Sequence, residues 1–556
     1  MKLSSLLPHK PAGYMIASMV CSFGGFLFGI DTGIIGPVTV MDDFKNYVGD
    51  PSPTIHGLIV SSILIPAAIS SFFAGKVADR LGRPKGIAIG SLIFGIGAAL
   101  EAASVHIAMF VVGRIVEGIG EGLYLGTLVV YICEVSPPRH RGALTTAPQL
   151  LVTLGLVTGF FTCYGSADIP SSFSWRLPFL LLAGYSLVFS VTTLLWLPAS
   201  PRWLTLRGRE DEAAAAWEKL GVDAADREKI LEQLPDSVAD GTANAATVDA
   251  SGSIMMTAVG PAAAVAAATL PGNPEAPPTT TKKPKSNSNS KMLDVLAPEA
   301  RPRLLLAVFL MGMQQLSGID GVLYYAPLLF QQAGLDSNAS AFLASGVSAI
   351  VIFAVTIPAT LWADRWSRRA NTILGGLGMT LTMFLMGALY ASNSVHPTEG
   401  AGRWVVIVCI YVFAVLYCIS WAVGIKVYAA EIQLPATRAS ATSIAHGSNW
   451  LSNFLVALVT PTLLAKTSYG AYFLFGGCTL LTALVCWGFM PETRGRSLDD
   501  IDRAFRERSK TTVTTEKKKK KKQGSHASSG FRQFVSKTVA RRVMGKMATT
   551  TATMDV

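Results

Sequence analysis

The sequence predicts an all-α membrane protein with twelve transmembrane helices in two pseudo-symmetric six-helix halves. Half of its 556 residues are apolar, only 15% are charged and the mean hydropathy is +0.42, which is too apolar for an ordinary soluble enzyme. Apolar runs long enough to cross a bilayer, which takes about 20 residues, recur twelve times along the chain. One set of charged motifs also appears at equivalent places in the two halves.

The twelve runs fall into two groups of six. The first six spans are predicted at residues 14–36, 57–78, 86–105, 107–131, 144–165 and 176–197, and the last six at 304–332, 341–363, 372–392, 404–430, 440–464 and 470–490. We expect the first run to be a retained helix and not a cleaved signal, because it contains Asp31 and several glycines.

Lysine and arginine set the expected orientation. They gather in every second connection, while the intervening loops are nearly free of them, so both termini are predicted to be cytoplasmic in a multi-pass plasma-membrane protein. The chain then divides into a cytoplasmic N-terminus (1–13), an N-terminal six-helix half (14–197), a cytoplasmic linker (198–303), a C-terminal six-helix half (304–490) and a basic cytoplasmic tail (491–556). The net charge of +11 reflects this topology and does not indicate a nucleic-acid partner.

The linker and the tail are predicted to differ in structure from the spans. Glu210 to Leu234 predicts short helices, and residues 239–289, rich in Ala, Gly, Pro, Ser and Thr, predict a disordered stretch. The tail contains the run Lys517 to Lys522, followed by apolar residues at helical spacing against basic ones. This segment predicts either an amphipathic helix on acidic lipids or a merely solvated tail.

The seventh run is polar where its neighbours are apolar. Gln314, Ser317, Tyr324 and Tyr325 fall within an arc of about 100° on a regular helix, with Asp320 at its edge. Glycines and a terminal proline allow this helix to bend or break. Uncharged amides and phenols exchange hydrogen bonds without the cost of a buried charge, so this face suits a ligand covered in hydroxyl groups.

The repeated charges suggest a gate on the cytoplasmic face. Asp-Arg-x-x-Arg motifs and Glu-x₆-Arg pairs occur once in each half, and they would hold that face closed by ion pairs. The alternative is positive-inside anchoring alone. The candidate gating residues are Asp79, Arg80, Arg83, Glu134 and Arg141 in the first half and Asp364, Arg365, Arg368, Glu431 and Arg438 in the second.

At these motifs the chain resembles the sugar porter family of the major facilitator superfamily, and it is most similar to fungal members. The signatures are GFLFGIDTGIIG (25–36), DRLGR (79–83), GRIVEGIGEG (113–122), EVSPPRHRG (134–142), PASPRWL (198–204), QQLSGIDGVLYYAP (314–327), DRWSRR (364–369), EIQLPATRA (431–439) and PETRGRSLDDID (491–502). The resemblance implies the major facilitator fold and proton-coupled import of a monosaccharide, a hexose or pentose, by alternating access.

The resemblance also implies the site residues. The sugar contacts would be Gln149, Gln314, Gln315, Asp320, Tyr324, Asn449 and Trp450. Trp450 would offer its ring to the C–H face of the sugar. The alternative for each amide is a role in helix packing.

Asp31 decides the energetics, because proton symporters of the family carry an Asp at this position and facilitators a neutral residue. If Arg114 pairs with ionised Asp31 and releases it on protonation, proton binding and gate position are coupled. A static salt bridge is the alternative. Glu117 and Glu121 lie three and seven residues after Arg114; Glu117 is placed to pair with Arg114 and either acid is a candidate proton carrier.

Three positions depart from the family pattern. Asp320 replaces an Asn, Lys426 replaces a Trp, and Ala199 replaces a Glu, which removes a carboxylate from the first-half gate. Lys426 either pairs with Asp320 or binds a carboxylate on the ligand, which would favour an acidic sugar such as galacturonate, or quinate, over the neutral monosaccharide we expect. For His446 we favour a buried, hydrogen-bonded role over titration near neutral pH.

Other function classes lack support in the sequence. It has no phosphate-binding loop, no H-E-x-x-H, no nucleophile with a base and no metal-ligand spacing, so we expect neither an enzyme nor a cofactor. Its predicted partners are a sugar, a proton and the lipid bilayer, with acidic lipids at the tail and no nucleic acid. A non-transporting sugar sensor of the same fold and a facilitator with permanently paired Asp31 remain as alternatives.

Overall fold

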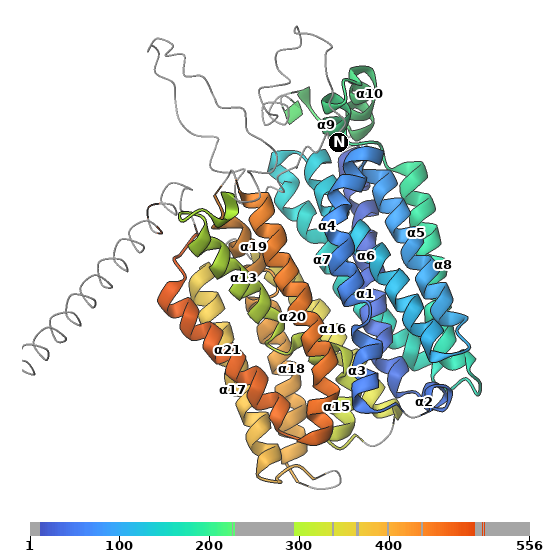
Figure 1. Ribbon diagram of the computed structural model, residues 1–556, viewed down its shortest axis with the longest axis vertical. Helices are drawn as coiled ribbons and strands as arrows, with labels where there is room; N and C mark the ends of the chain where they lie inside the picture. The colour runs from blue at the N-terminus through green and yellow to red at the C-terminus, as the bar shows by residue number, and fades with distance from the viewer. Residues whose placement is uncertain are drawn as a thin grey trace, which may run out of the picture. The chain divides into compact units, whose positions relative to one another are not determined.

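The computed structural model describes residues 12–49, 51–224, 226–227, 294–335, 338–362, 366–396, 400–434, 437–494, 503 and 505. Its contacts divide the chain into two compact units, residues 1–494 and 495–556. All helices named below belong to the first unit (Figure 1). The predictions for residues 239–289 and for the lysine run and the amphipathic segment of the tail lie outside the described residues.

Each of the first six predicted spans is helical. The helices are α1 (Gly13–Val40), α3 and α4 (Pro53–Ser61 and Leu64–Leu81), α5 (Arg83–Ala102), α6 (Ile107–Val135), α7 (Pro138–Ser166) and α8 (Phe173–Trp196). The short helix α2 (Asp42–Val48) follows α1, and α9 (Pro201–Leu206) and α10 (Glu210–Leu220) follow α8. Helix α10 lies within residues 210–234, where short helices were predicted, and α9 precedes that range.

The last six spans are helical as well, and two of them are broken. The seventh consists of α13 (Arg301–Gln315), α14 (Ile319–Tyr324) and α15 (Ala326–Gln332), and the tenth of α18 (Gly402–Ser420) and α19 (Gly424–Glu431). The others are α16 (Asn338–Trp362), α17 (Arg368–Ala391), α20 (Arg438–Lys466) and α21 (Gly470–Phe489), and a 3₁₀ turn, η2 (Asp294–Leu296), precedes α13.

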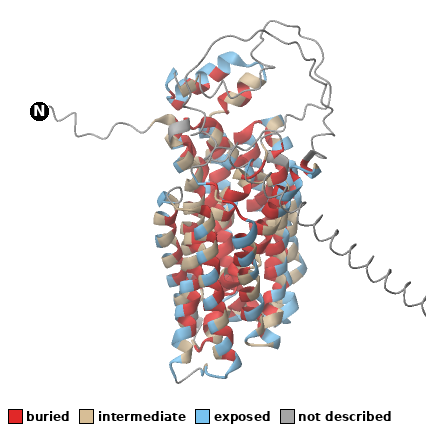
Figure 2. Ribbon diagram, turned by 90° about the vertical axis from the view of Figure 1, so that its left-hand side faces the viewer, coloured by how far each residue is buried: buried red, intermediate tan, exposed pale blue. Residues whose placement is uncertain are grey.

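Eleven segments within the described ranges are long and apolar enough to cross a membrane. They account for every predicted span except the eleventh, which is α20. This helix has 29 residues, enough to span a bilayer, and its first half is rich in Ser, Thr and Asn. Large apolar side chains such as Phe72, Leu195 and Trp487 are exposed, as expected for contact with lipid. Exposed residues recur along the outer helices of the bundle (Figure 2).

The halves pack internally and against each other. In the first half α1 packs on α7 and α5 packs on both α6 and α8, while in the second half α17 packs on α21 and α13 on α20. Contacts between the halves run through α7 with α16 and through α20 with α3 and α4. Helix α1 also contacts α14 and α15, so the broken seventh span lies at the interface of the halves.

The predicted break in the seventh span is confirmed. Gly318 separates α13 from α14 with φ of +87°, a conformation that favours glycine, and a Cβ there would lie 2.5 Å from the ring of Phe475. Because the helix stops here, the regular arc expected for its polar residues does not continue through it. Ser317 bonds the Gln314 carbonyl of its own helix, and Tyr325 donates to Ala457 of α20.

Candidate functional site

The helical bundle has two ends, which differ in the connections that they carry. The linker end is where α8 ends and α13 begins, and the opposite end is where α1 ends and α5 and α6 are joined.

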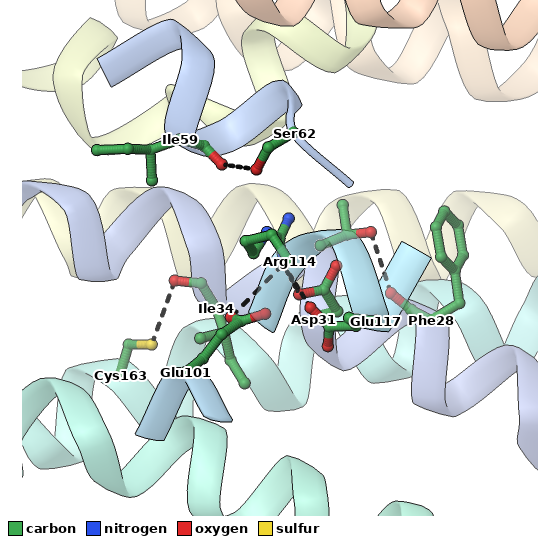
Figure 3. A network of polar contacts seen from close by, with 10 residues as sticks. Phe28, Asp31, Ile34, Ile59, Ser62, Glu101, Arg114, Glu117 and Cys163 are labelled. Carbon is green, nitrogen blue, oxygen red and sulfur yellow. Dashed lines mark hydrogen bonds and ion pairs between the residues drawn. The ribbon is translucent and has the colours of Figure 1, made fainter. Parts of the chain in front are cut away.

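Arg114 on α6 is the centre of a buried acidic cluster. Its Nη1 lies 2.5 Å from Oδ1 of Asp31 on α1 and 2.9 Å from Oε2 of Glu117 one turn along α6 (Figure 3). Both predicted contacts of Arg114 are therefore present. The side chains are at most 5% exposed, so the ion pairs lie in a low-dielectric interior where water screens them little.

A third acid in the cluster was not predicted. Glu101, on the last turn of α5, places Oε2 3.9 Å from the same Arg114 nitrogen and is fully buried. Glu121, the next acid on α6, is fully buried too, and neither of its oxygens has a hydrogen-bond partner in the described part of the chain. The sequence did contain a signal that could have identified Glu101. It is a carboxyl group inside an apolar run, and such groups are rare in spanning helices unless they are functional.

The amides predicted to bind sugar form one network. Gln314 is fully buried and donates to the carbonyl of Trp421 at 2.8 Å, and its own Oε1 accepts from Asn449 at 3.3 Å. Gln315 donates to Oδ1 of Asn449 at 3.3 Å. Asn449 also donates to the Met311 carbonyl, so it ties α20 to α13 and links both glutamines. Oε1 of Gln315 is left without a hydrogen-bond partner among the described residues.

The predicted charges of the second half face one another. Asp320 of α14 interacts electrostatically with Lys426 of α19 and hydrogen-bonds to Gln315. Lys426 is exposed and also interacts with His446 of α20. Nδ1 of His446 lies 3.0 Å from the Thr442 carbonyl, as the hydrogen-bonding prediction required, but the prediction of burial was wrong because the ring is exposed.

The remaining predicted sugar contacts lie on three helices. Tyr324 of α14 is buried in an apolar cluster that spans both halves, and Trp450 of α20 packs against that cluster while staying partly exposed. Gln149 of α7 is partly exposed. Their roles in binding remain predictions.

At the linker end, the charged residues of the first half form ion pairs within that half. Buried Arg83 lies 2.9 Å from Asp79 and 3.1 Å from Glu134, which joins the start of α5 to the ends of α4 and α6. Arg141 is buried and Arg80 is exposed. Trp203 and Arg207 donate to the Asp79 carbonyl, so the first turns of the linker also hold the end of α4.

At the same end, the second half is held together by a different set of polar contacts. Arg368 lies 3.7 Å from Glu431, and Glu492 accepts from the Ser367 hydroxyl and from the backbone amides of Arg368 and Arg369 at the start of α17. Burial alone would raise the pKa of Glu492, but hydrogen bonds from Ser367 and from three backbone amides outweigh it and hold the pKa below the usual glutamate value.

The structure does not describe the side chains of three gating candidates. Asp364 and Arg365 lie outside the described residues, and of Arg438 only its place at the start of α20 is given. Ala199 packs against the apolar cluster of α9 and α10, where the resembled family carries a carboxylate.

Comparison with known proteins gives consistent matches. A family model described as "Sugar (and other) transporter" matches residues 17–254 and 274–505. The chain is 29% identical over 520 residues to the sugar transport protein MST7 of Oryza sativa, which covers 88% of this chain and 91% of that protein. It is 28% identical over 492 residues to the glucose transporter GlcP of Staphylococcus epidermidis, covering 88% and 96%.

A solved structure shares the fold. The partially occluded, inward-open form of the xylose transporter XylE from E. coli superposes with a TM-score of 0.65 at 24% identity, covering 87% of this chain and 99% of that one. The same fold thus accommodates two chains that differ at three quarters of their aligned positions.

Proposed function

Because the chain belongs to the family of sugar (and other) transporters and has its twelve-helix major facilitator fold, we propose that it imports a monosaccharide by proton symport. It is a membrane transporter and not an enzyme. The observation that carries the proton-coupling part of this proposal is the buried contact of 2.5 Å between Arg114 and Asp31. The relatives that transport glucose and galactose support a sugar as the cargo.

The amide network suits a neutral hexose or pentose. Gln314, Gln315 and Asn449 offer donors and acceptors held in place by their bonds to one another, and such groups exchange readily for sugar hydroxyls. Trp450 lies one residue after Asn449 and supplies an apolar ring for the sugar's C–H face. Gln149, from the other half, would close around the sugar from the opposite side.

Asp31 and Arg114 would couple proton binding to the movement of the helices that carries the sugar across the membrane. An ionised Asp31 holds Arg114, and both charges are stable in the interior only while they remain paired. Protonation of Asp31 removes its charge and frees α1 from α6. Proton binding then favours one arrangement of the helices over the other, which is the differential stabilisation that coupling requires.

An acidic sugar is the second candidate, because Lys426 is exposed and charged where the resembled family has a Trp. Asp320 competes for the same ammonium group, since the two interact. If Asp320 neutralises Lys426 the site takes a neutral sugar, and if a ligand carboxylate displaces Asp320 it takes a sugar acid such as galacturonate, or quinate.

The orientation follows from the charges. We place the linker end and both termini in the cytoplasm and the protein in the plasma membrane, because lysine and arginine concentrate at the linker end. The basic tail would then face the acidic inner leaflet. The ion pairs at this end would rearrange as the cytoplasmic gate opens and closes; they involve Asp79, Arg83, Glu134, Arg368 and Glu431.

The test is uptake of labelled glucose and labelled galacturonate in transporter-deficient yeast, at acidic and neutral external pH, for wild type and Asp31→Asn. We expect wild type to accumulate glucose in acid and the variant only to equilibrate it, because a neutral residue cannot take up the proton. Accumulation of galacturonate alone would assign Lys426 as the carboxylate anchor. Absence of both sugars from cells that display the protein at their surface would defeat the proposal in favour of a sensor.

A further inference from the structure

The Arg114 cluster contains more acid than base. Asp31, Glu101 and Glu117 all approach the same guanidinium nitrogen, and all three are buried. Arginine stays protonated in proteins, so it neutralises only one carboxylate. An unpaired charge costs several kcal/mol in such an interior. The cluster is neutral only when two of its three carboxyl groups carry protons.

Glu101 and Glu117 are the two carboxyl groups that carry protons, because Asp31 forms the shortest ion pair with Arg114. Within the part of the chain that the structure describes, neither oxygen of Glu101 has a hydrogen-bond donor, and Oε1 of Glu117 lacks one as well. The two groups are nevertheless within hydrogen-bonding reach of each other. Two carboxylates only accept hydrogen bonds, whereas a carboxylic acid donates one. A proton between Glu101 and Glu117 therefore satisfies atoms that are otherwise orphaned in the interior.

Two glycines bring these acids together. A Cβ at Gly97 of α5 would lie 2.4 Å from the backbone nitrogen of Glu117, and a Cβ at Gly113 of α6 would lie 2.7 Å from Cγ of Glu101. Any larger residue at either position would push α5 and α6 apart. The close packing thus holds the Glu101 and Glu117 side chains against each other across the helix pair.

The pair forms a path inward from the end of the bundle. Glu101 is the next-to-last residue of α5 and lies level with Gly113, beside the connection formed by residues 103–106. Glu117 lies level with Gly97, one turn further from that connection. Arg114 then links Glu117 to Asp31 through its Nη1 (Figure 3).

We propose that Glu101 and Glu117 form a proton relay that conducts a proton from the connection between α5 and α6 to Asp31. This deepens the proposed symport and rests on it. Glu117 passes its proton to Asp31, Glu101 passes its proton to Glu117, and Glu101 then takes up a proton from water. Each transfer breaks one O–H bond and forms another, Arg114 stays cationic throughout, and the cluster gains one proton as the contact between Asp31 and Arg114 is released.

Other groups around the relay affect its proton affinity. The helices packed against α5 and α6 bring few ionisable side chains to this level, since the charged residues of α4 lie towards its linker end. The groups that interact with the pair are Asp31 from α1 and Arg114 and Tyr124 from α6. Arg176 from α8 donates to the carbonyl of Ala102, the residue after Glu101.

The experiment uses the full chain with Glu101→Gln and Glu117→Gln. Glutamine has the shape of a neutral glutamate, so both variants should fold and still exchange sugar across the membrane by counterflow. Proton-driven accumulation should fall by about tenfold or more, because a positioned proton carrier speeds transfer by at least that factor. The infrared carbonyl band of protonated carboxyl groups in the purified protein should weaken in Glu101→Gln.

Glu212→Gln is the matched control. It removes a carboxyl group that pairs with Arg209 on the exposed face of α10, outside the cluster, so the infrared band, accumulation and its pH profile should all persist. An equal loss of accumulation in Glu212→Gln would overturn the relay, as would wild-type accumulation and an unchanged band in Glu101→Gln. If sugar uptake by the wild-type protein does not depend on pH, the proposed symport itself is overturned. If wild-type accumulation depends on pH and Glu101→Gln accumulates sugar equally well, only the relay is overturned.

Discussion

Asn449 orders two other amides at once. It donates to Gln314 and accepts from Gln315, so its side chain helps to fix the orientation of both glutamines. Replacing it with alanine takes one hydrogen bond from each glutamine and removes one proposed sugar contact. We expect Asn449→Ala to raise the KM for sugar uptake about tenfold, which corresponds to the ~1.4 kcal/mol of one well-placed hydrogen bond.

The control for this variant is Asn371→Ala. Asn371 donates to the Ile419 carbonyl at 3.0 Å in the same half but takes no part in the amide network. Its loss should lower thermal stability without a change in KM. Equal KM values for wild type and Asn449→Ala, at equal surface expression, would assign these amides to helix packing.

Sequence patterns located most of the polar residues and some of their partners. Asp31, Arg114 and Glu117 could be predicted as a group because local spacing and family resemblance both pointed to them. Glu101 could not be joined to them, because its contact with Glu117 depends on how closely α5 and α6 approach at Gly97 and Gly113. For His446 the local hydrogen bond was predictable from position, whereas its exposure depends on the packing of three helices.

At the scale of single elements, helix α17 begins with a capping acid that comes from a distant segment. Glu492 accepts two backbone amides there, and carboxylates at a helix N-terminus are stabilising. Helix α5, its counterpart in the first half, is held by Asp79, Glu134 and Trp203 at the corresponding connection. The sequence repeat predicted the shared charges of the two ends but not this difference in how each end is fastened.

The cap at α17 predicts a pH-dependent stability. Glu492→Gln should lower the free energy of unfolding by about 1 kcal/mol at neutral pH, the usual contribution of a cap. Because the folded-state pKa of Glu492 is lowered, its contribution is present above the ordinary glutamate pKa of about 4.3 and is lost as pH falls through the lowered value. Thermal unfolding of the purified protein, measured from neutral pH to pH ~3, should show the difference shrink in acid.

Glu212→Gln serves as the comparison for this measurement. Glu212 pairs with Arg209 on the exposed face of α10, and exposed pairs contribute little. Its unfolding curve should match wild type at every pH. A Glu492→Gln variant as stable as wild type at neutral pH would show that the carboxylate does not hold α17.

Over the whole molecule, the break in the seventh span could be predicted, whereas the break in the tenth span and the contacts between the halves could not. Glycine, proline and the run of polar residues marked the broken seventh span in advance. The contact of α1 with α14 and α15 depends on how two six-helix bodies meet, and no local pattern carries that information. At Gly36 the backbones of α1 and α14 approach each other closely.

This close approach joins the two halves at the opposite end of the bundle. A Cβ at Gly36 would lie 2.1 Å from the backbone oxygen of Tyr324, and the neighbouring Tyr325 ring meets His56 of α3 edge-on at 5.3 Å. A backbone oxygen in a packed helix cannot move aside as a flexible side chain does. Gly36→Ala should therefore disfavour the arrangement in which this end is closed, and the transporter should rest open towards the outside.

Thiol accessibility measures that shift. In a His56→Cys background, a membrane-impermeant thiol reagent added outside cells should react several-fold faster when Gly36→Ala is also present, while net uptake falls because the carrier no longer closes. Gly126→Ala is the matched substitution, since a Cβ at that helical glycine meets nothing within 4 Å. Reaction rates that are equal in the Gly36 and Gly126 variants would mean that the contact with Tyr324 does not control closure. If the thiol reacts faster only in the Gly36→Ala variant, the result would indicate that the outer side of the transporter closes when α1 approaches α14.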